Sequence, residues 1–298
     1  MPIHTNTLKN LYHSNRLARW MLQPFVSARS KMHQFQQMPA IAVVDRLKHL
    51  AAEDICVTVK EFEGSFNLSP ASHLLHRVLV DGHYEPDLAR IARERLDPTR
   101  DAVDIGANIG FFSVLFGKHL SSGRVLSVEP SASARRRLLA NLARNGIPPE
   151  RSIVFDGLMG RNDSVGQLHV IDGMEEYSSA AKVSHTAVNG REARVEEVPQ
   201  ATLDTLVRRH ALNPGFIKID IEGFEMEALK GAEWTLKTYH PVILSELSDP
   251  LLRLNGSSSR DVVEFLEHLG YAVTDPLFPG SRAGERPYGD LLAVPLKA

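Results

Sequence analysis

Glycines and acidic residues at fixed spacings mark the first part of this chain that could carry out chemistry. Asp104, Gly106, Asn108 and Gly110 follow one short apolar run, and Glu129 ends the next. Glycines let a strand turn sharply into a helix because they adopt positive φ angles at little cost, and the amides that begin the helix then face a ligand. A carboxylate ending the second strand can accept hydrogen bonds from both hydroxyls of a ribose. The pattern predicts a site for an adenosine-containing molecule.

The residue at position 108 helps to decide which adenosine-containing ligand fits. Dinucleotide sites use the spacing G-x-G-x-x-G, in which the second glycine lets a pyrophosphate approach the backbone. Here Gly106 is followed by Asn108, whose side chain would crowd a pyrophosphate. S-adenosylmethionine has no phosphates, and its sulfonium and ammonium cations favour nearby acids, so we expect Asp104 to lie at its methionine half. The spacing favours S-adenosylmethionine, with a nicotinamide or flavin cofactor as the alternative.

A second acidic group alternates with isoleucines between Phe216 and Gly223. Strand side chains point to alternate faces, which predicts that Lys218, Asp220 and Glu222 share one face. Buried parallel strands are normally apolar on both faces, and charges there are costly unless they are paired or used. The carboxyl ends of such strands are also where open α/β sheets bind ligands. We therefore predict that Asp220 and Glu222 belong to an active site, with Lys218 holding the carboxylates in place.

These carboxylates have two competing chemical uses. Asp220 could act as general base toward an acceptor hydroxyl. Alternatively, Asp220 and Glu222, with Glu246 from the end of the next strand, could hold Mg²⁺, which takes oxygen ligands and would acidify that hydroxyl. Three histidines are further candidates for the base: His83, His185 and His240. A lone histidine is more often structural or solvated, and a buried salt bridge of Lys218 with an acid is the purely structural alternative.

Strands and helices alternate from about residue 100 onward, as the positioning of these groups requires. Strands are predicted to end at Ile105 and Glu129 and to span Ile153–Phe155, Phe216–Ile221, Val242–Leu247, Tyr271–Thr274 and Leu291–Pro295. Helices are predicted at Phe111–Leu120, Ser133–Arg144, Leu203–Leu212, Glu225–Tyr239 and Asp261–Leu269, and a hairpin at Val165–Ile171 and Ala193–Val198. The alternation predicts an α/β fold, in which helices cover both faces of a parallel sheet.

The N-terminal part has a different character. Basic residues outnumber acidic ones over the first fifty positions, and Leu17, Trp20 and Met21 have the spacing of a short amphipathic helix. Such an arm could bind an anionic surface or cover the substrate, but packing on the domain or on a second subunit, as in a homodimer, is the favoured interpretation. A strand at Ile55–Phe62 and helices at Pro70–Asp81 and Tyr84–Leu96 are predicted to follow.

Composition excludes several classes of protein. The 298 residues are 43% hydrophobic, and their net charge of −2 carries no global nucleic-acid signature. Cys56 is the only cysteine, so we expect no intrachain disulfide and a reducing, cytoplasmic location. No apolar run approaches the roughly 18 residues of a membrane span, and the run at Trp20 is too short for a secretory signal.

Motifs in order across residues 82–246 resemble those of the FkbM family of S-adenosylmethionine-dependent methyltransferases. They are Gly82-His83-Tyr84-Glu85-Pro86, Val103 to Phe112, Val128-Glu129-Pro130, Asn141 with Asn145, Thr202-Leu203-Asp204, Ile217 to Glu225, Gly231-Ala232 and Pro241 to Glu246. The resemblance implies a class I methyltransferase fold, which is Rossmann-like, with a seven-stranded, mostly parallel sheet whose last strand is antiparallel. It also implies O-methylation of a hydroxyl, often on a sugar or a secondary metabolite.

The same resemblance assigns roles to individual residues. It implies that the cofactor is contacted by Gly106, Asn108, Gly110 and Glu129. Glu85 would help to hold the methionine end, and Asp156, just after the third strand, would reach the adenine. The catalytic domain would then span residues 82–298, after a basic, partly helical extension over residues 1–81 that contains a short strand.

These motifs do not indicate which acceptor is methylated. They include neither the N-terminal extension nor the predicted loop at Asp172–Gly190. A small molecule or a glycan is the expected acceptor. A cofactor-binding scaffold without catalysis, or an RNA methyltransferase that uses the basic arm as an electrostatic footprint, are the alternatives. The acids at Asp220 and Glu222 argue against the scaffold, and the near-neutral core argues against RNA.

Overall fold

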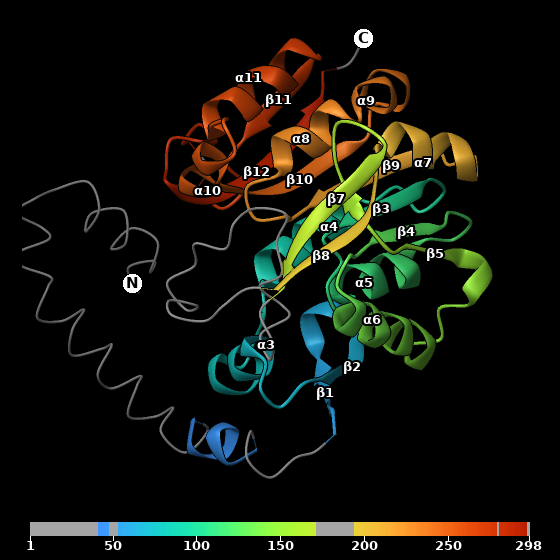
Figure 1. The fold of residues 1–298 in the computed structure, drawn as a ribbon, viewed down its shortest axis with the longest axis vertical. Helices are drawn as coiled ribbons and strands as arrows, with labels where there is room; N and C mark the ends of the chain where they lie inside the picture. The colour runs from blue at the N-terminus through green and yellow to red at the C-terminus, as the bar shows by residue number, and fades with distance from the viewer. Residues whose placement is uncertain (1–40, 48–52, 171–193, 279, 297–298) are drawn as a thin grey trace, which may run out of the picture.

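A seven-stranded sheet forms the centre of the protein in the computed structural model, which describes residues 41–47, 53–170, 194–278 and 280–296 (Figure 1). The strand order is β11-β12-β10-β9-β3-β4-β5. The strands are β3 (Asp101–Ile105), β4 (Val125–Val128), β5 (Ser152–Phe155), β9 (Pro214–Ile219), β10 (Val242–Ser248), β11 (Tyr271–Thr274) and β12 (Tyr288–Pro295). β12 is antiparallel to both of its neighbours, and the other pairs are parallel. The sheet predicted from the family motifs is confirmed.

Helices cover both faces of this sheet, as the alternation of elements predicts. One face packs against α7 (Leu203–His210), α8 (Glu225–Lys230), α9 (Glu233–Tyr239) and α11 (Ser259–His268). The other face packs against α4 (Pro86–Arg95), α5 (Phe111–His119) and α6 (Ala132–Arg144). Apolar side chains alternate between the two clusters along each strand. Ile217 and Ile219 face the first cluster and Phe216 faces the second, so Lys218 is the charged member of the second face.

The N-terminal segment folds differently from its prediction. The strand predicted at Ile55–Phe62 ends at Val59, and a short 3₁₀ turn leads into a second, unpredicted strand, so that β1 (Ile55–Val59) and β2 (Gly64–Leu68) form a hairpin. The helix predicted at Pro70–Asp81 begins only at His73, as α3 (His73–His76), and ends in a π-helical turn. Ser72 caps α3 by accepting a hydrogen bond from the Leu75 amide. The hairpin and α3 pack with α5 and α6.

The single helix predicted at Glu225–Tyr239 is wrong, because two helices meet there. Helix α8 ends at Lys230, and a side chain on the next residue, Gly231, would lie 2.0 Å from the carbonyl oxygen of Gly160. Helix α9 then begins at Glu233, where the Asp204 carboxylate accepts hydrogen bonds from the amides of Trp234 and Thr235. A carboxylate from a distant helix therefore acts as the cap that local sequence cannot predict.

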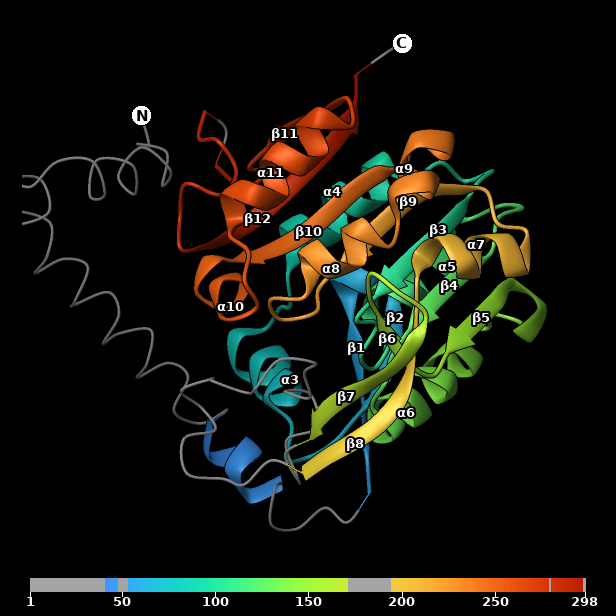
Figure 2. The ribbon, with the colours of Figure 1, turned by 45° about the horizontal axis from the view of Figure 1, so that its top comes forward.

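Further elements complete the described part of the chain. The predicted hairpin is confirmed as β7 (Ser164–Val170) and β8 (Arg194–Ala201), which join β6 (Leu158–Met159) in a second sheet. Figure 2 shows this hairpin as a long ribbon outside the main sheet. Helix α10 (Asp249–Leu254) was not predicted. The loop predicted at Asp172–Gly190 and the amphipathic helix at Leu17 lie outside the described residues.

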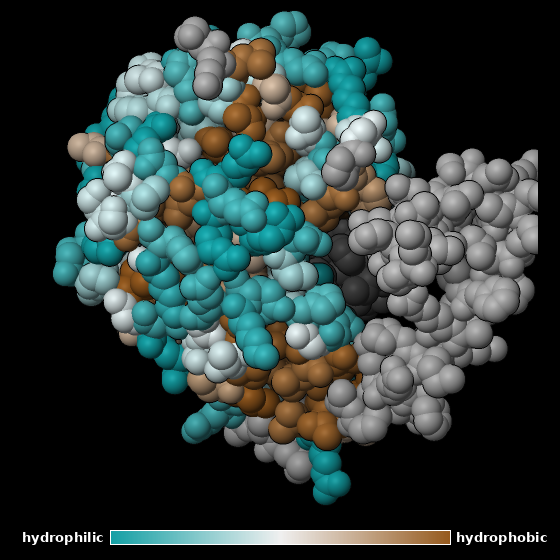
Figure 3. Space-filling model, turned by 180° about the vertical axis from the view of Figure 1, so that it is seen from behind, coloured by the Kyte–Doolittle hydropathy of each residue, from teal (hydrophilic) through white to brown (hydrophobic). Residues whose placement is uncertain are grey.

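The surface of the described part is mixed. Seen from behind, hydrophilic side chains run down the middle of the molecule, and hydrophobic ones gather towards its lower end (Figure 3). Within the described residues, no helix is long and apolar enough to cross a membrane.

Candidate active site

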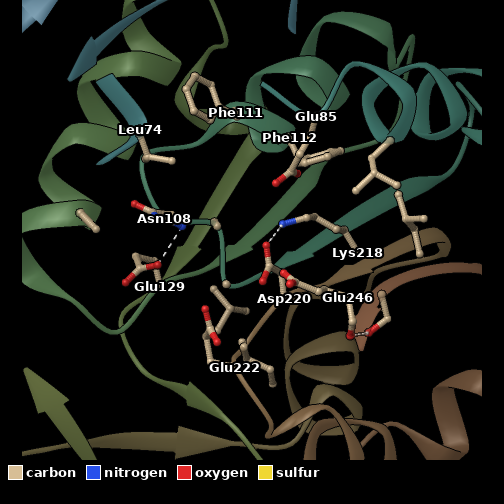
Figure 4. Close-up of a pocket in the computed structure, with 18 of the residues that line it drawn as sticks. Leu74, Glu85, Asn108, Phe111, Phe112, Glu129, Lys218, Asp220, Glu222 and Glu246 are labelled. Atoms are coloured by element: carbon tan, nitrogen blue, oxygen red, sulfur yellow. Dashed lines mark hydrogen bonds and ion pairs between the residues drawn. The ribbon is translucent and has the colours of Figure 1, made fainter. Parts of the chain in front are cut away.

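A cavity of about 560 Å³ opens at the carboxyl ends of β3, β4, β9 and β10. Both sequence motifs reach it, together with the loop that precedes α4 (Figure 4). Its charged lining consists of Arg77, Glu85, Asp87, Glu129, Lys218, Asp220, Glu222, Glu246 and Asp290. Aromatic and apolar side chains, among them Tyr84, Phe111, Phe112, Leu158 and Met159, complete it. Acids outnumber bases on these walls, which suits a ligand with positive charge.

The glycine turn is held in shape by its neighbours. Gly106, Asn108 and Gly110 all have positive φ angles, of 80°, 49° and 93°. A side chain at position 106 would lie 1.9 Å from the carbonyl oxygen of Asp220. Only glycine permits this approach, which brings the backbones of the two motifs together. The expected glycine turn is present, and Asn108 occupies a left-handed conformation that asparagine tolerates better than most residues.

Glu129 lies beside that turn. One carboxylate oxygen accepts a hydrogen bond from the Asn108 amide and the other from the Ser131 amide, each at 2.8 Å. Burial raises the pKa of Glu129 to about 7, although these two amides oppose the shift. The amides fix the orientation of the carboxylate, and each oxygen keeps a second lone pair for a ligand hydroxyl.

Asp104 does not reach the cavity, contrary to the sequence-based expectation. It is completely buried beneath the turn, where one oxygen accepts a hydrogen bond from the Ser113 hydroxyl at 2.6 Å. Its other oxygen has no hydrogen-bond partner among the residues that the structure describes. Burial raises the pKa of Asp104, and the nearby charge of Lys218 opposes that shift. Asp104 belongs to strand β3 itself and precedes the glycine turn at Gly106 by two residues.

Lys218, Asp220 and Glu246 form a chain of charged groups along one wall. The Lys218 ammonium lies 2.9 Å from an Asp220 oxygen and 4.6 Å from the centre of the Phe112 ring. Burial lowers the pKa of Lys218, but Asp220, Asp104 and Glu85 together reverse the shift and raise it. The raised pKa favours the cationic form of Lys218, which pairs with the Asp220 carboxylate.

Asp220 and Glu246, the two carboxyl groups of this chain of charged groups, differ in pKa. Burial raises the pKa of Asp220, yet Lys218 outweighs it and the net pKa is lowered. The charge of Asp220, followed by burial, raises the pKa of Glu246 well above its usual range. The two side chains interact with each other, and their pKa values are shifted in opposite directions.

Glu222 follows the strand rather than forming part of it. Strand β9 ends at Ile219, so the predicted strand Phe216–Ile221 is too long by two residues. Glu222 adopts a left-handed conformation with φ of 49°, which aims its carboxylate into the cavity (Figure 4). Burial, and then the charge of Asp220, raise the pKa of Glu222 to about 7. Strand alternation grouped Glu222 with Lys218 and Asp220, and all three line the cavity, although Glu222 reaches it through a turn.

The structure adds cavity residues that the sequence did not single out. Asp290 on β12 lies directly opposite Glu246 on β10, and burial, then Glu85, raise its pKa to about 7. Arg77 lies 3.9 Å from Glu85 and stacks on the Tyr84 ring. Glu85, as predicted, lines the cavity. The alternation of side chains along the last strand could have indicated which residues share a face with Asp290. The sequence did not show which strand pairs with this one, so the position of Asp290 opposite Glu246 could not be predicted.

Other predicted residues lie elsewhere. Asp156 is exposed and lines a separate surface hollow beside α6, not this cavity. His83 and His240 are exposed and do not line the cavity, and His185 lies outside the described residues. His73, which the sequence did not indicate as a site residue, lines the cavity.

The metal hypothesis finds no support in the arrangement of side chains. Within the described ranges, no group of three His, Cys, Asp or Glu side chains is placed to hold a metal ion. Asp220 is already engaged by Lys218, so the described side chains give no support to the predicted Mg²⁺ site.

The residues do fit S-adenosylmethionine. Glu129 offers free lone pairs to ribose hydroxyls, and Leu158 and Met159 give an apolar wall for an adenine. The remaining carboxylates face the cavity, where cationic groups of that cofactor would lie. The charge of Arg135 lowers the pKa of the buried Glu129, against the larger effect of burial.

Comparison with known proteins was made on sequence and on structure. The sequence model of the methyltransferase FkbM domain matches residues 104–273. The AMB antimetabolite synthetase AmbE of Pseudomonas aeruginosa is 37% identical over 78 residues, which are 26% of this chain and 3% of that protein. The chain therefore spans only a small part of the length of this curated relative.

Solved structures resemble this chain at low identity. The FkbM methyltransferase of Methylobacillus flagellatus is 20% identical, with 67% of this chain and 44% of that chain covered and a TM-score of 0.44. The tRNA (uracil-54, C5)-methyltransferase of Pyrococcus abyssi, in complex with S-adenosyl-L-homocysteine, is 14% identical, with 82% and 44% covered and a TM-score of 0.42. Fibrillarin of Aeropyrum pernix, with bound S-adenosyl-L-methionine, is 12% identical, with 67% and 69% covered and a TM-score of 0.37.

These structural likenesses are too distant to carry an argument about the acceptor. The family match is different, because it covers more than half of the chain and contains both the glycine turn and the acidic strand end. The sheet order and the antiparallel last strand agree with it. This chain belongs to the FkbM family of S-adenosylmethionine-dependent methyltransferases.

Proposed function

We propose that this protein transfers a methyl group from S-adenosylmethionine to a hydroxyl of a sugar, a glycan or a secondary metabolite. The observation that carries the proposal is the position of Glu222 and Asp220. Both line the same cavity as Glu129, and burial and the neighbouring charge raise the pKa of Glu222 to about 7. A base whose pKa lies near the working pH is the kind that removes a proton from a hydroxyl efficiently.

The cofactor half of the site rests on the glycine turn. In this proposal, Glu129 accepts hydrogen bonds from the two ribose hydroxyls, and Gly106 and Asn108 present bare backbone to the ligand. Glu85 holds the ammonium of the methionine end. Bound there, S-adenosylmethionine supplies an electrophilic methyl group. Asp156 is not included, because it faces another hollow.

The acidic wall supplies the proton chemistry. Glu222 accepts the proton of the acceptor hydroxyl as its oxygen forms the new bond to the methyl carbon. Asp220 has a lowered pKa because of Lys218, so it serves as a fixed acceptor of a hydrogen bond and orients the hydroxyl. Alignment of the two reactants is the larger contribution to such a transfer.

The proposal is tested with methyl-labelled S-adenosylmethionine and an extract of hydroxylated metabolites and glycans. We expect label in base-stable ethers, and we expect Asp220→Asn and Glu222→Gln each to lower turnover by about 10²-fold or more at intact cofactor affinity. Glu264→Gln, which removes an exposed acid on α11 outside the cavity, is the matched control and should keep full turnover. Wild-type turnover in both cavity variants, or label only on nitrogen or carbon, would contradict the proposal.

No observation favours either of the alternative functions, which are a scaffold without catalysis and an RNA methyltransferase. A scaffold without catalysis has no use for Glu222 at a pKa near 7, and the acids of the cavity repel a phosphate backbone. The basic N-terminal arm lies largely outside the described residues. Its role in partner binding or dimer formation therefore stays a prediction.

A further inference from the structure

The turn that carries Glu222 has a strained backbone conformation. Beyond the end of β9, Glu222 and Gly223 have positive φ angles of 49° and 92°. The Phe224 amide donates a hydrogen bond to the Ile221 carbonyl at 3.3 Å, as in a type I′ turn, which favours glycine, asparagine or aspartate at its central positions. A glutamate at the first of these positions is strained, and such a conformation persists only when neighbouring groups hold it.

Glu225, the first residue of α8, supplies one of these holding contacts. It is only 2% exposed, and one oxygen of its carboxylate accepts a hydrogen bond from the Gly223 amide at 3.0 Å. The other oxygen has no hydrogen-bond partner among the described residues, and burial raises the pKa of Glu225 to about 7. Burial of an acid is costly. Because Glu225 does not line the cavity, its hydrogen bond to the turn is the contact that bears on the site.

Helix α10 supplies a second contact with the same turn. The side chain of Asn255, directly after this helix, donates hydrogen bonds to the carbonyls of Gly223 at 3.2 Å and of Leu251 at 3.0 Å. A Cβ atom added to Gly223 would lie 2.7 Å from the carbonyl group of Leu251. The turn and the helix are therefore in direct contact, and both backbone polar groups of Gly223 are bound by side chains.

Helix α10 is in turn fixed to the edge of the sheet. It begins at Asp249, directly after β10 ends. The Asp249 amide donates a hydrogen bond to the Pro287 carbonyl at 2.8 Å, and its carboxylate accepts one from the Ser259 amide at 2.9 Å. Because β10 also carries Glu246 into the cavity, these contacts fix the turn of Glu222 relative to the opposite wall.

An equivalent asparagine holds a segment that is not part of the cavity. Asn145 lies directly after α6, and its side chain donates hydrogen bonds to the carbonyls of Asn141 and Ser65, each at 2.8 Å. It also accepts one from the Ser65 amide at 3.0 Å. Neither Asn145 nor Ser65 lines the cavity. The two asparagines thus have the same local chemistry and differ in the segment that each one holds.

Resting on the proposed function, we infer that Glu225 and Asn255 are positioning residues for methyl transfer and act through Glu222. By binding the amide and the carbonyl of Gly223, they keep the Glu222 carboxylate aimed into the cavity (Figure 4). Neither residue lines the cavity. A displacement of about 1 Å at a reacting group can lower a rate by about 10²-fold, so a loosened turn lowers turnover without weakening the cofactor site.

The inference is tested on the full chain with methyl-labelled S-adenosylmethionine and an extract of hydroxylated metabolites and glycans, by the initial rate of ether labelling. Glu225→Met removes the acceptor of the Gly223 amide but keeps the length of the side chain, and Asn255→Ala removes the donor to its carbonyl. Each should lower the rate about tenfold or more. In a Glu222→Gln background each should lower it less than twofold, because the carboxylate through which they act is already absent. The affinity for S-adenosylhomocysteine should stay within twofold.

Two further variants serve as controls. Glu225→Gln keeps an oxygen for the Gly223 amide and should retain at least a third of the wild-type rate. Asn145→Ala should lower the melting temperature at least as much as Asn255→Ala and keep the full rate.

The decisive comparison is between the two backgrounds. Equal losses of rate with and without Glu222 would overturn the inference, as would an unchanged rate in folded Glu225→Met or Asn255→Ala. No ether label with the wild type, or a wild-type rate in Glu222→Gln itself, would instead remove the proposed function, and the inference with it.

Discussion

At the scale of single residues, the site depends on how burial and neighbouring charge separate the properties of chemically similar acids. Lys218 lowers the pKa of Asp220, whereas the charge of Asp220 and burial raise the pKa of Glu246 well above its usual range. Glu222 lies nearby, where burial and the charge of Asp220 raise its pKa to about 7. Three carboxyl groups within one cavity therefore differ in pKa.

The raised pKa of Glu222 predicts a dependence of stability on pH. Because this pKa rises from 4.5 in the unfolded chain to about 7 in the folded protein, the folded state holds the extra proton between those values and stability falls as pH increases through that window. We expect Glu222→Gln to unfold at the wild-type free energy at pH 4.5 and to be about 1–2 kcal/mol more stable at pH 8, after allowance for solvent in the cavity. Urea unfolding at the two pH values measures this.

The control for that measurement is Glu264→Gln, which removes an acid from an exposed ion pair with Arg260. Its free energy of unfolding should follow the wild-type pH profile. An unchanged pH profile in Glu222→Gln would show that Glu222 is ionised at no cost and that its pKa is not raised.

At the scale of elements, much of the site was predictable because the strands and turns that carry it have local signals. The glycine turn before α5, the strand ends at Glu129 and Asp220, and the hairpin of β7 and β8 all follow from residue patterns. The break between α8 and α9 does not, because Asp204 and Gly160 come from distant parts of the chain. Local sequence contains no sign of a contact that only the tertiary fold creates.

The contact between the two motifs predicts a specific effect at the glycine turn. We expect Gly106→Ala to destabilise the protein by about 3 kcal/mol or more, because its new side chain would meet the Asp220 carbonyl and its φ is 80°. Gly146→Ala is the matched control, since Gly146 also has a positive φ, of 74°, but nothing lies within 4 Å of a new side chain. That variant should lose only about 1 kcal/mol.

Thermal or urea unfolding of both glycine variants gives the comparison. Similar losses at the two positions would mean that backbone strain alone accounts for the effect and that the motifs are not in tight contact. A larger loss at Gly106, with cofactor binding also weakened, is the outcome that the close approach requires.

At the scale of the whole molecule, the seven-stranded sheet brings groups from five strands to one edge. The family motifs predicted a seven-stranded, mostly parallel sheet with an antiparallel last strand, and the pairing of β10 with β12 in the structure places Asp290 opposite Glu246. Sequence alone could not supply that pairing, because β12 follows β10 only after three other elements and antiparallel register has no local signal. Asp104 shows the reverse case, in which a residue within a recognisable motif is turned into the core.

The central claim is that S-adenosylmethionine binds in this cavity with its ribose on Glu129. Isothermal titration of the full chain with S-adenosylmethionine tests it most directly, with Glu129→Ala as the variant and Glu264→Ala as the control for loss of an acid outside the cavity. Two hydrogen bonds to a buried carboxylate correspond to roughly 10- to 100-fold in affinity. We predict that loss for Glu129→Ala and wild-type affinity for Glu264→Ala, whereas unchanged affinity in a folded Glu129→Ala, or no binding by the wild type, would contradict the claim.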